Sequence, residues 1–299
     1  MARDEGDQVM QIYIPSLGRA SAAALRAGPL ADLPERRVRS ALLVVPSQEA
    51  EAYMGALREV YADENRPCVL GVEARGIAAT RLVIGEHARD CGRDRFVMMD
   101  DDVRFLVRKS AENWQLHAPT TQEVEQMLSH VSLLLDTHAH VGVSAREGNN
   151  RAGVGGPEAL VRENTRTLRV LAYRTADFLA CEHGRVEVME DFDVNLQLLE
   201  RGLSNACTHY YAQGQKMTNA PGGCSTYRSH AVHEASARRL AELHPGLVRL
   251  RQKENKTDRE GFGTRTEVTI SWQKAHQQGL QTRARAAADA SEARAEAAA

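Results

Sequence analysis

The sequence lacks the features that mark membrane and secreted proteins. No stretch approaches 18 consecutive apolar residues, so no transmembrane helix is predicted. The chain begins MARDEGDQ, which is acidic and does not have the charged and then apolar pattern of a signal peptide. We therefore expect a cytoplasmic protein with no membrane partner.

Paired cysteines and a strong charge of one sign are also missing. The five cysteines are odd in number, widely spaced and never in a C-x-x-C pair, so neither a disulfide framework nor a zinc framework is predicted. The 38 Lys and Arg residues nearly balance the 40 Asp and Glu residues, for a net charge of −2. Any attraction to nucleic acid must therefore come from local basic patches.

The chain does contain alternating strand and helix patterns. Residues 10–16, 40–47 and 67–73 read as strands, and residues 48–64 and 76–91 have the 3.6-residue period of helices. A run of β-α units predicts an α/β fold with a parallel sheet and right-handed crossovers. In such sheets ligands bind at the carboxyl ends of the strands.

The stretch RFVMMDDDVRF, residues 95–105, places three aspartates directly after an apolar strand. Adjacent carboxylates repel one another, so they either point into water or are neutralised by a cation. A hard divalent ion is the usual choice for oxygen ligands. Taken by themselves, the three aspartates fit an acidic loop or a helix cap as well as a metal site. Their position at a strand end favours a metal site at Asp100, Asp101 and Asp102.

A second acidic centre lies in EVMEDFDVNLQLLERG, residues 187–202. Asp191 or Asp193 could cap the helix that ends at Gly202. Clustered acids at a helix start are also how a general base or an acceptor-binding carboxylate is presented. Both interpretations stay open from these residues.

The remaining segments give weaker signals. Residues 120–139 predict an amphipathic helix, 140–146 a strand, and 147–164 a long loop rich in Gly and Asn. Residues 249–259, RLRQKENKTDR, form the best basic run, which suits either a diphosphate or a DNA backbone, or is a solvated loop. The Ala-, Arg- and Glu-rich tail at 276–299 is expected to be helical or disordered.

These features together resemble the GT-A type nucleotide-sugar glycosyltransferases. Asp100 and Asp102 match the two ends of the family's DxD motif, and Glu190 and Asp191 match its later ED. The stretch RGIAATRLVIGEHA is similar to the family's Arg-bearing helix. The resemblance implies a Rossmann-like, mostly parallel sheet with flanking helices in a single large domain. That domain would span residues 1–275, with a donor half at about 10–145 and an acceptor half at about 146–275.

A narrower resemblance covers roughly residues 10–275. The order IPSLGRA, MMDDDV, MEDFDVNLQLLERG, then NAPGGC with YR, is similar to the TET/JBP-associated glycosyltransferases, which include the base J enzyme and many phage relatives. It implies transfer from a UDP-sugar, with UDP-glucose expected, to a 5-hydroxymethylpyrimidine (5hmC or 5hmU) in double-stranded DNA. The location would be the host cytoplasm for a phage-encoded enzyme.

The resemblance also assigns roles to individual residues. Mn²⁺ or Mg²⁺ would bind Asp100 and Asp102, with His244 as the late histidine and His230 and His233 as alternatives. Asp191, with Glu190, would act as base or hold the acceptor. The donor nucleotide would be held by Pro15, Ser16, Arg19, Arg75, Arg81, Asp100, Asp101, Gly222, Gly223, Arg228 and Lys253.

Two other functions compete with sugar transfer. A nucleotidyltransferase is also α/β with metal-binding acids, but it normally has a Gly-rich loop with Arg and Lys after the first strand, where this chain has only PSLGRA. The second alternative is a nucleotide-binding or DNA-binding module without catalysis. The residues themselves do not determine which sugar is transferred or which modified base accepts it. They also leave open whether transfer inverts or retains the anomeric centre, and the oligomeric state.

Overall fold

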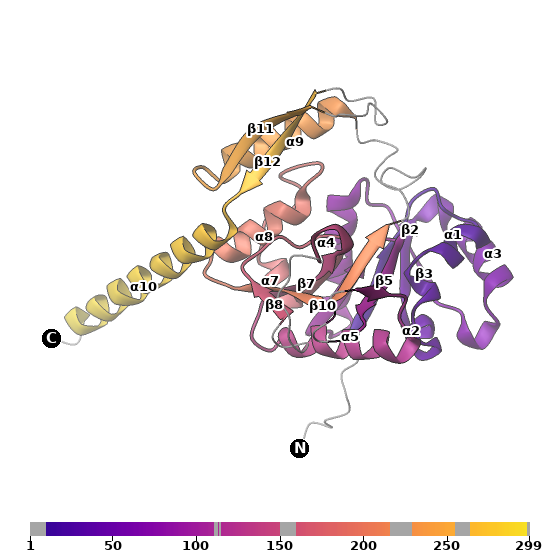
Figure 1. The fold of residues 1–299 in the computed structure, drawn as a ribbon. Coiled ribbons are helices and arrows are strands. Elements are labelled where there is room, and N and C mark those ends of the chain that lie inside the picture. The colour runs from indigo at the N-terminus through magenta and orange to yellow at the C-terminus, as the bar shows by residue number, and fades with distance from the viewer. Residues whose placement is uncertain are drawn as a thin grey trace, which may run out of the picture.

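A ten-stranded sheet forms the centre of the molecule (Figure 1). The structure is a computed structural model, and it describes residues 10–110, 113, 115–149, 160–215, 229–254 and 264–297. The sheet strands are β1 (Gln11–Pro15), β2 (Leu42–Pro46), β3 (Cys68–Val72), β4 (Arg95–Met99), β5 (Val103–Arg108), β6 (Leu116–His117), β7 (His140–Ala145), β8 (Val161–Glu163), β9 (Val170–Arg174) and β10 (Asn205–Gln215).

The strand order is β3-β2-β1-β4-β9-β7-β10-β5-β6, and β8 also pairs with β10. The pairs β3/β2, β2/β1, β1/β4 and β7/β10 are parallel, whereas β9 is antiparallel to both β4 and β7. Strands β1 to β4, β7 and β10 therefore run in one direction, as the β-α alternation predicts. Their carboxyl ends lie at the same edge of the sheet.

Helices cover both faces of this sheet. They are α1 (Ala22–Ala27), α2 (Glu35–Ser40), α3 (Ala50–Val60), α4 (Ile77–Asp90), α5 (Thr121–Leu134), α6 (Arg146–Asn149), α7 (Thr175–Leu179), α8 (Glu190–Glu200), α9 (His230–Leu243) and α10 (Trp272–Ala297). Short 3-10 turns occupy Pro29–Ala31, Ser47–Glu49 and Asp63–Asn65. Within the described ranges, no helix is long and apolar enough to cross a bilayer.

Alternate residues of the central strands enter two separate cores. Ile12 and Ile14 pack on one face of the sheet with residues of α1, α3 and α5. Tyr13, from the same strand, packs on the opposite face with residues of α4, α7 and α8. Because strands alternate their side chains, a strand buried on both faces is apolar throughout. The run Phe96–Met99 obeys this rule, since all four of its residues are at most 1% exposed.

A smaller third core joins α8 to the C-terminal part of the chain. Its members come from α8, α9, the start of α10 and the antiparallel hairpin of β11 (Val248–Glu254) and β12 (Thr264–Ile270). Figure 1 shows α9 and this hairpin as a separate upper layer, with α10 running away from the body toward the C-terminus. We call α9 and the β11–β12 hairpin the upper lobe.

Several elements differ from the sequence-based expectations. The strand β5 follows the three aspartates at once, so these residues form the turn between two strands rather than the start of a loop. The predicted loop 147–164 contains the end of α6 and the short strand β8. The basic run is strand β11 through Glu254. The boundary predicted at residue 275 falls inside α10, which is helical through Ala297.

Helix α10 is held against α8 at a pair of glycines. A Cβ atom at Gly279 would overlap the carbonyl oxygen of Leu199, and it would also lie 2.4 Å from the amide nitrogen of Gly202. Gly202 ends α8 with φ of +71°, the left-handed conformation that favours glycine. The backbones of the two helices therefore approach more closely here than a side chain permits.

This close approach gives a stability prediction with a matched control. Gly279→Ala should lower the free energy of unfolding by about 1–3 kcal/mol, because the methyl group forces the backbones apart. Gly55→Ala, inside α3, should instead raise it by about 0.5–1 kcal/mol, since no described atom lies within 4 Å of a Cβ atom there and alanine is the better helix former. Urea unfolding followed by circular dichroism measures both values. Equal stabilisation by the two substitutions would contradict the close packing.

Candidate functional site

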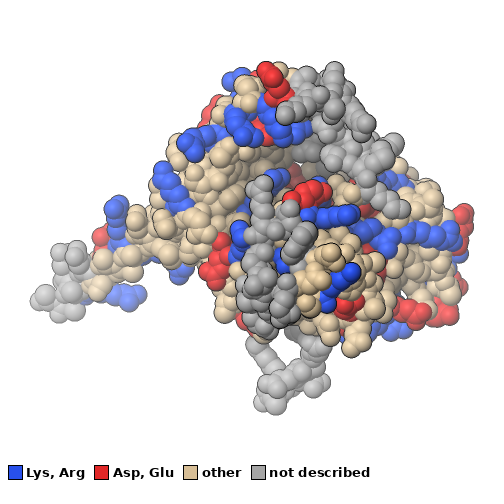
Figure 2. All heavy atoms as spheres, in the orientation of Figure 1, with Lys and Arg blue, Asp and Glu red and all other residues tan. Residues whose placement is uncertain are grey.

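A cavity of about 1030 Å³ opens at the carboxyl edge of the sheet, between the body and the upper lobe. One wall comes from the ends of β1, β2 and β3 and from the start of α4, including Pro15, Ser16, Arg19, Pro46, Arg75, Thr80 and Arg81. The opposite wall comes from the loop before β9, the start of α8 and the upper lobe, including Arg166, Asp191, Phe192, His230, His233, Arg265, Glu267 and Trp272. The three aspartates lie between the walls. Figure 2 shows the hollow beneath the upper lobe and the basic side chains on the lobe itself.

Each aspartate in the turn after β4 has its own polar partners. Asp100 lies 3.3 Å from Nη2 of Arg81. Asp101 accepts hydrogen bonds from the Ser16 hydroxyl and the Arg19 guanidinium. Asp102 accepts from Nε2 of Gln215 at 2.6 Å and lies 3.0 Å from Arg19. The two arginines therefore supply part of the positive charge that three adjacent carboxylates require.

The carboxylates remain strained electrostatically despite these contacts. Burial raises the pKa of Asp100 to about 7, with the charges of Asp102 and Asp101 adding to the effect and Arg81 opposing it. Burial also raises the pKa of Asp101 to about 6, although the Ser16 hydrogen bond and Arg19 oppose it. The ionised turn can accept further positive charge.

Arg81 connects this turn to the second acidic centre. Arg81 is 8% exposed, and its guanidinium lies 2.5 Å from Oε1 of Glu190 and 3.3 Å from Oδ1 of Asp100. Arg81 projects from α4, Asp100 follows β4 and Glu190 opens α8, so three elements meet at one side chain. The two acidic centres separated by 90 residues in the sequence are neighbours in the fold.

Asp191 lines the cavity at the first turn of α8. Met189, with φ of +68°, is the residue that precedes this helix, and no side chain caps it. Asp191 Oδ1 accepts a hydrogen bond from the amide of Phe192 at 3.0 Å. The structure therefore does not use Asp191 as the helix cap, and the three acids in the first turn interact favourably with the helix dipole.

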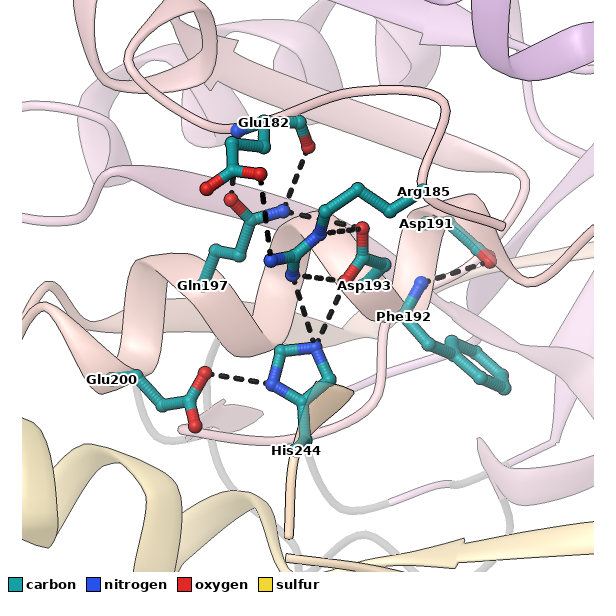
Figure 3. Close-up of polar contacts among 8 residues, drawn as sticks. All are labelled: Glu182, Arg185, Asp191, Phe192, Asp193, Gln197, Glu200 and His244. Atoms are coloured by element: carbon teal, nitrogen blue, oxygen red, sulfur yellow. Dashed lines mark hydrogen bonds and ion pairs between the residues drawn. The ribbon is translucent and has the colours of Figure 1, made fainter. Parts of the chain in front are cut away.

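Asp193 and His244 have a different role from the one that the sequence indicates. Asp193 is buried and accepts from Nε of Arg185 at 3.0 Å and from Nε2 of His244 at 2.8 Å. Nδ1 of His244 lies 2.7 Å from Glu200. Figure 3 shows the imidazole between the two carboxylates, with the Arg185 guanidinium next to both Asp193 and the imidazole. His244 ends α9, and both acids belong to α8, so this network fastens the upper lobe to α8.

The prediction that His244 binds the metal is not supported by this arrangement. Carboxylates only accept hydrogen bonds, so both ring nitrogens of His244 must donate and neither has a lone pair for a metal ion. His244 is also absent from the cavity wall. His230 and His233 do line the cavity, and their Nε2 atoms lie 3.1 and 3.0 Å from the carbonyl oxygens of Thr264 and Thr266.

The other predicted residues divide into three groups. Pro15, Ser16, Arg19, Arg75 and Arg81 lie together on the wall formed by the strand ends and the start of α4. Lys253 is exposed on β11, where it contacts Glu267 at 3.3 Å, and it does not line the cavity. Gly222, Gly223 and Arg228 lie outside the described residues.

Sequence reasoning missed several cavity residues. Phe192, Trp272 and Arg166 form part of the wall opposite the strand ends, and Gln215 reaches Asp102 from β10. Phe192 directly follows Asp191, so its position beside the acidic centre was a usable signal. Arg166 and Trp272 carry no local motif, and only the tertiary fold brings them to the cavity.

Comparison with known proteins supplies the family. A family model described as TET-Associated Glycosyltransferase matches residues 10–223. This chain belongs to that family. The glycosyltransferase class and the single-domain α/β fold of GT-A type expected from the sequence are thereby confirmed, and the competing nucleotidyltransferase assignment is set aside.

Individual relatives are more distant. The Beta-glucosyl-HMC-alpha-glucosyl-transferase of Enterobacteria phage T2 is 23% identical over 221 residues, which is 69% of this chain and 73% of the relative. Among solved structures, the mannosyltransferase PcManGT from Pyrobaculum calidifontis in complex with GDP-Man and Mn²⁺ has a TM-score of 0.48 and 13% identity, covering 79% of this chain and 62% of that one. TarS residues 1–349 from S. aureus in complex with UDP-GlcNAc has a TM-score of 0.44 and 12% identity, covering 78% and 66%.

The His244 network predicts how stability depends on pH. Burial alone would lower the pKa of His244, but the hydrogen bonds to Asp193 and Glu200 outweigh burial and raise it. The folded state therefore holds this proton more tightly than the unfolded state, whose histidine pKa is about 6.5. The resulting stabilisation is complete below that value and is lost as pH rises through the folded pKa. Asp193, Glu200 and Arg185 are the charged groups that face the ring.

His244→Gln should lower the free energy of unfolding by about 1.5–3 kcal/mol at pH 6, because hydrogen bonds to charged groups are lost. The difference from wild type should shrink as pH is raised from 6 to 9, when measured by denaturant unfolding. His183→Gln serves as the control, since burial lowers the pKa of His183 and its contribution should stay constant between pH 7 and 9. A His244→Gln difference that grows with pH would contradict a charged imidazole.

Proposed function

We propose that this chain transfers a hexosyl group from a UDP-sugar, with UDP-glucose as the expected donor, to the hydroxymethyl group of a 5-hydroxymethylpyrimidine in DNA. The observation that carries the proposal is the position of Asp100–Asp102 and of Asp191 in one cavity, where Arg81 pairs with Asp100 and with Glu190, the neighbour of Asp191. One acidic centre suits a metal-bound diphosphate, and the other suits an acceptor hydroxyl. Membership of the TET-associated glycosyltransferases supports this reaction class.

The donor is expected on the wall formed by β1, β2, β3 and the start of α4. Arg19, Arg75 and Arg81 line this wall and bring positive charge to the region where a diphosphate would lie. Ser16 lies close to Asp101 and is itself 2.6 Å from the Tyr53 hydroxyl. The arrangement holds the acidic turn in place at the carboxyl edge, where α/β sheets bind their ligands.

The donor atoms in the turn suit Mn²⁺ or Mg²⁺. Within the residues that the structure describes, no three His, Cys, Asp or Glu side chains converge to form a complete metal site. Mg²⁺ sites that use substrate phosphates need only one or two carboxylates from the protein, and Asp100 and Asp102 provide these hard oxygen ligands. A bound ion would neutralise charge that develops on the departing diphosphate. Arg19 and Arg81 would stabilise the same charge from the protein side.

Asp191 is the group that we assign to the acceptor. In an inverting transfer its carboxylate takes the proton of the hydroxymethyl group as the oxygen attacks the sugar. In a retaining transfer it holds that hydroxyl by a hydrogen bond. Glu190 is bonded to Arg81, so its role is to set the position of the first turn of α8.

The upper lobe supports a DNA acceptor through the two faces of its hairpin. Directly paired residues of an antiparallel hairpin share a face, and successive residues alternate. Val248, Leu250 and their partners Ile270 and Val268 therefore lie on one face, and Val248, Val268 and Ile270 belong to the third core beside α9. The other face presents Arg249, Arg251, Lys253 and Arg265, together with Glu267 and Thr269. Residues of both faces of β12 line the cavity, Val268 and Ile270 from the apolar face and Arg265, Glu267 and Thr269 from the basic face, so the basic face extends outward from the cavity wall.

The name of the phage T2 relative contains beta-glucosyl-HMC, an HMC that already carries glucose, so it supports a modified nucleobase as the acceptor class and not the free hydroxymethyl group in particular. A hydroxymethyl group on a base inside a duplex is reached only after the nucleotide is turned out of the stack. A large cavity with basic residues at its mouth suits a flipped nucleotide and the phosphates beside it.

The direct test is to incubate the protein with UDP-glucose, Mn²⁺ and duplex oligonucleotides that contain 5hmC or 5hmU, followed by nucleoside mass spectrometry. Glucosylated nucleoside is expected from at least one modified duplex and none from unmodified DNA. Asp191→Asn should lower the transfer rate at least about 100-fold, the lower range for general acid-base catalysis, while UDP-glucose affinity is retained. Glu187→Gln, which removes an exposed acid four residues before Asp191, is the control. If the protein glucosylated hydroxyl groups of other molecules and never a nucleoside in DNA, the DNA acceptor would be refuted.

Metal dependence has its own test. Calorimetry with UDP-glucose should show tight binding in Mn²⁺ and weak binding in EDTA, because the diphosphate and the acidic turn repel each other without a cation. Asp102→Asn should remove the Mn²⁺-dependent part of the affinity. Asp177→Asn should leave this affinity intact, because Asp177 lies on α7 and pairs with Arg174. Equal affinity with and without metal would rule out the proposed ion.

Salt dependence tests the basic face of the hairpin. Arg249→Gln with Lys253→Gln should flatten the slope of log affinity for modified duplex against log salt, by about 0.9 for each phosphate contact that is lost. UDP-glucose affinity should not change. The control is Arg238→Gln with Arg239→Gln, two exposed charges on α9 that pair with Glu234 and Glu242. An unchanged slope in the hairpin variant would place the DNA elsewhere.

A further inference from the structure

The cavity contains an aromatic pair to which the proposed function gives no role in donor binding, metal binding or general-base catalysis. Phe192 and Trp272 are the Phe, Tyr and Trp side chains among the described residues that line it. Their ring centroids are 5.7 Å apart with an interplanar angle of 78°, an edge-to-face contact. Such pairs hold each other in a defined orientation. Two rigid rings therefore form part of the acceptor-side wall.

Both rings are only partly buried. They pack against the edge of the third core, and the cavity lies on their other side. Phe192 occupies the first turn of α8 beside Asp191, and Trp272 begins α10 directly after the hairpin. This position is across the cavity from the donor wall of β1, β2 and β3.

Arg166 shows that the face of Phe192 can stack against a flat group. Its guanidinium carbon lies over the Phe192 ring, 5.0 Å from the centroid, and the side chain is exposed in the loop between β8 and β9. A guanidinium is planar and stacks on aromatic faces, as nucleobases do. Because Arg166 is exposed and both side chains line the cavity, a nucleobase can replace the guanidinium on this ring, and the displaced cation can meet a phosphate.

We propose that Phe192, which contacts Trp272, stacks the extrahelical pyrimidine of the acceptor in place of the Arg166 guanidinium and thereby brings its hydroxymethyl group to Asp191. This inference rests on the proposed function. A base that leaves the duplex loses the stacking with its neighbours, and an aromatic side chain replaces part of it. Phe192 and Asp191 are consecutive, so the same helical turn holds the ring of the acceptor and receives its hydroxyl.

The test compares Phe192→Leu with two matched variants. Leucine keeps apolar packing against the third core but removes the flat face, whereas Phe192→Tyr keeps the face and should restore function. Tyr210→Leu is the control for loss of an aromatic ring, because Tyr210 forms a similar edge-to-face pair with Tyr211, at 5.2 Å and 75°, outside the cavity. The substrates are UDP-glucose and the modified duplex that wild type glucosylates.

Phe192→Leu should raise the KM for modified duplex about 10- to 100-fold, within the range that base stacking supplies. The Kd for UDP-glucose in Mn²⁺ should stay within twofold of wild type, and Phe192→Tyr and Tyr210→Leu should keep a wild-type KM for DNA. An unchanged KM in Phe192→Leu would overturn the proposal, and so would a weakened UDP-glucose Kd, which would assign the ring to the donor. An effect confined to duplex whose base already carries glucose would also overturn it, because the ring would then hold a sugar.

Fluorescence provides a second readout that does not depend on turnover. The chain has two tryptophans, so Trp114→Phe leaves Trp272 as the single reporter. Modified duplex should quench its emission, whereas UDP-glucose alone should not. If wild type modifies no hydroxymethylated duplex, the proposed function fails. If wild type modifies the duplex while Phe192→Leu and the Trp272 signal are unaffected, only the stacking assignment fails.

Discussion

The site depends on one buried guanidinium. Arg81 lies between Asp100 at the end of β4 and Glu190 at the start of α8, and these two elements carry the carboxylates that we assign to the donor and to the acceptor. Removing one partner from a buried ion pair typically costs about 3–5 kcal/mol, because the remaining charge is left uncompensated. The same contact therefore stabilises the fold and sets how far apart the two acidic centres lie.

Much of the donor half could be predicted from the sequence because its signals are local. Strands buried on both faces are continuous apolar runs, and the residues just after them meet at one edge of a parallel sheet, so Ser16 and Asp100 were expected near one another. Arg75 was added only by the family resemblance. The Arg81 contact with Glu190 was not predicted. It joins residues 109 positions apart, and nothing in either segment alone specifies the pairing.

The acceptor half was harder to predict because its residues depend on tertiary packing. His244 has the residue type of a metal ligand, but its partners Asp193 and Glu200 lie one turn and three turns into α8 on the side away from the cavity, and they use both ring nitrogens. Lys253 has the charge expected for a phosphate contact, but the hairpin register pairs it with Arg265 and brings it to Glu267. Arg166, Phe192 and Trp272 come from three separate elements and meet only in the folded chain.

Helix α8 contributes to two cores at once, and this affects how the family can diversify. Val194 and Leu198 pack under the sheet, while Leu196 and Leu199 pack with the upper lobe. The lobe supplies one wall of the cavity, and the ends of β1 to β3 supply the other. If the two walls hold the acceptor and the donor as we propose, sequence change in the lobe would alter what is accepted without disturbing how the nucleotide is held, provided the lobe-facing side of α8 is kept. Grafting residues 229–272 between members of the family would then be a rational route to new acceptor specificities.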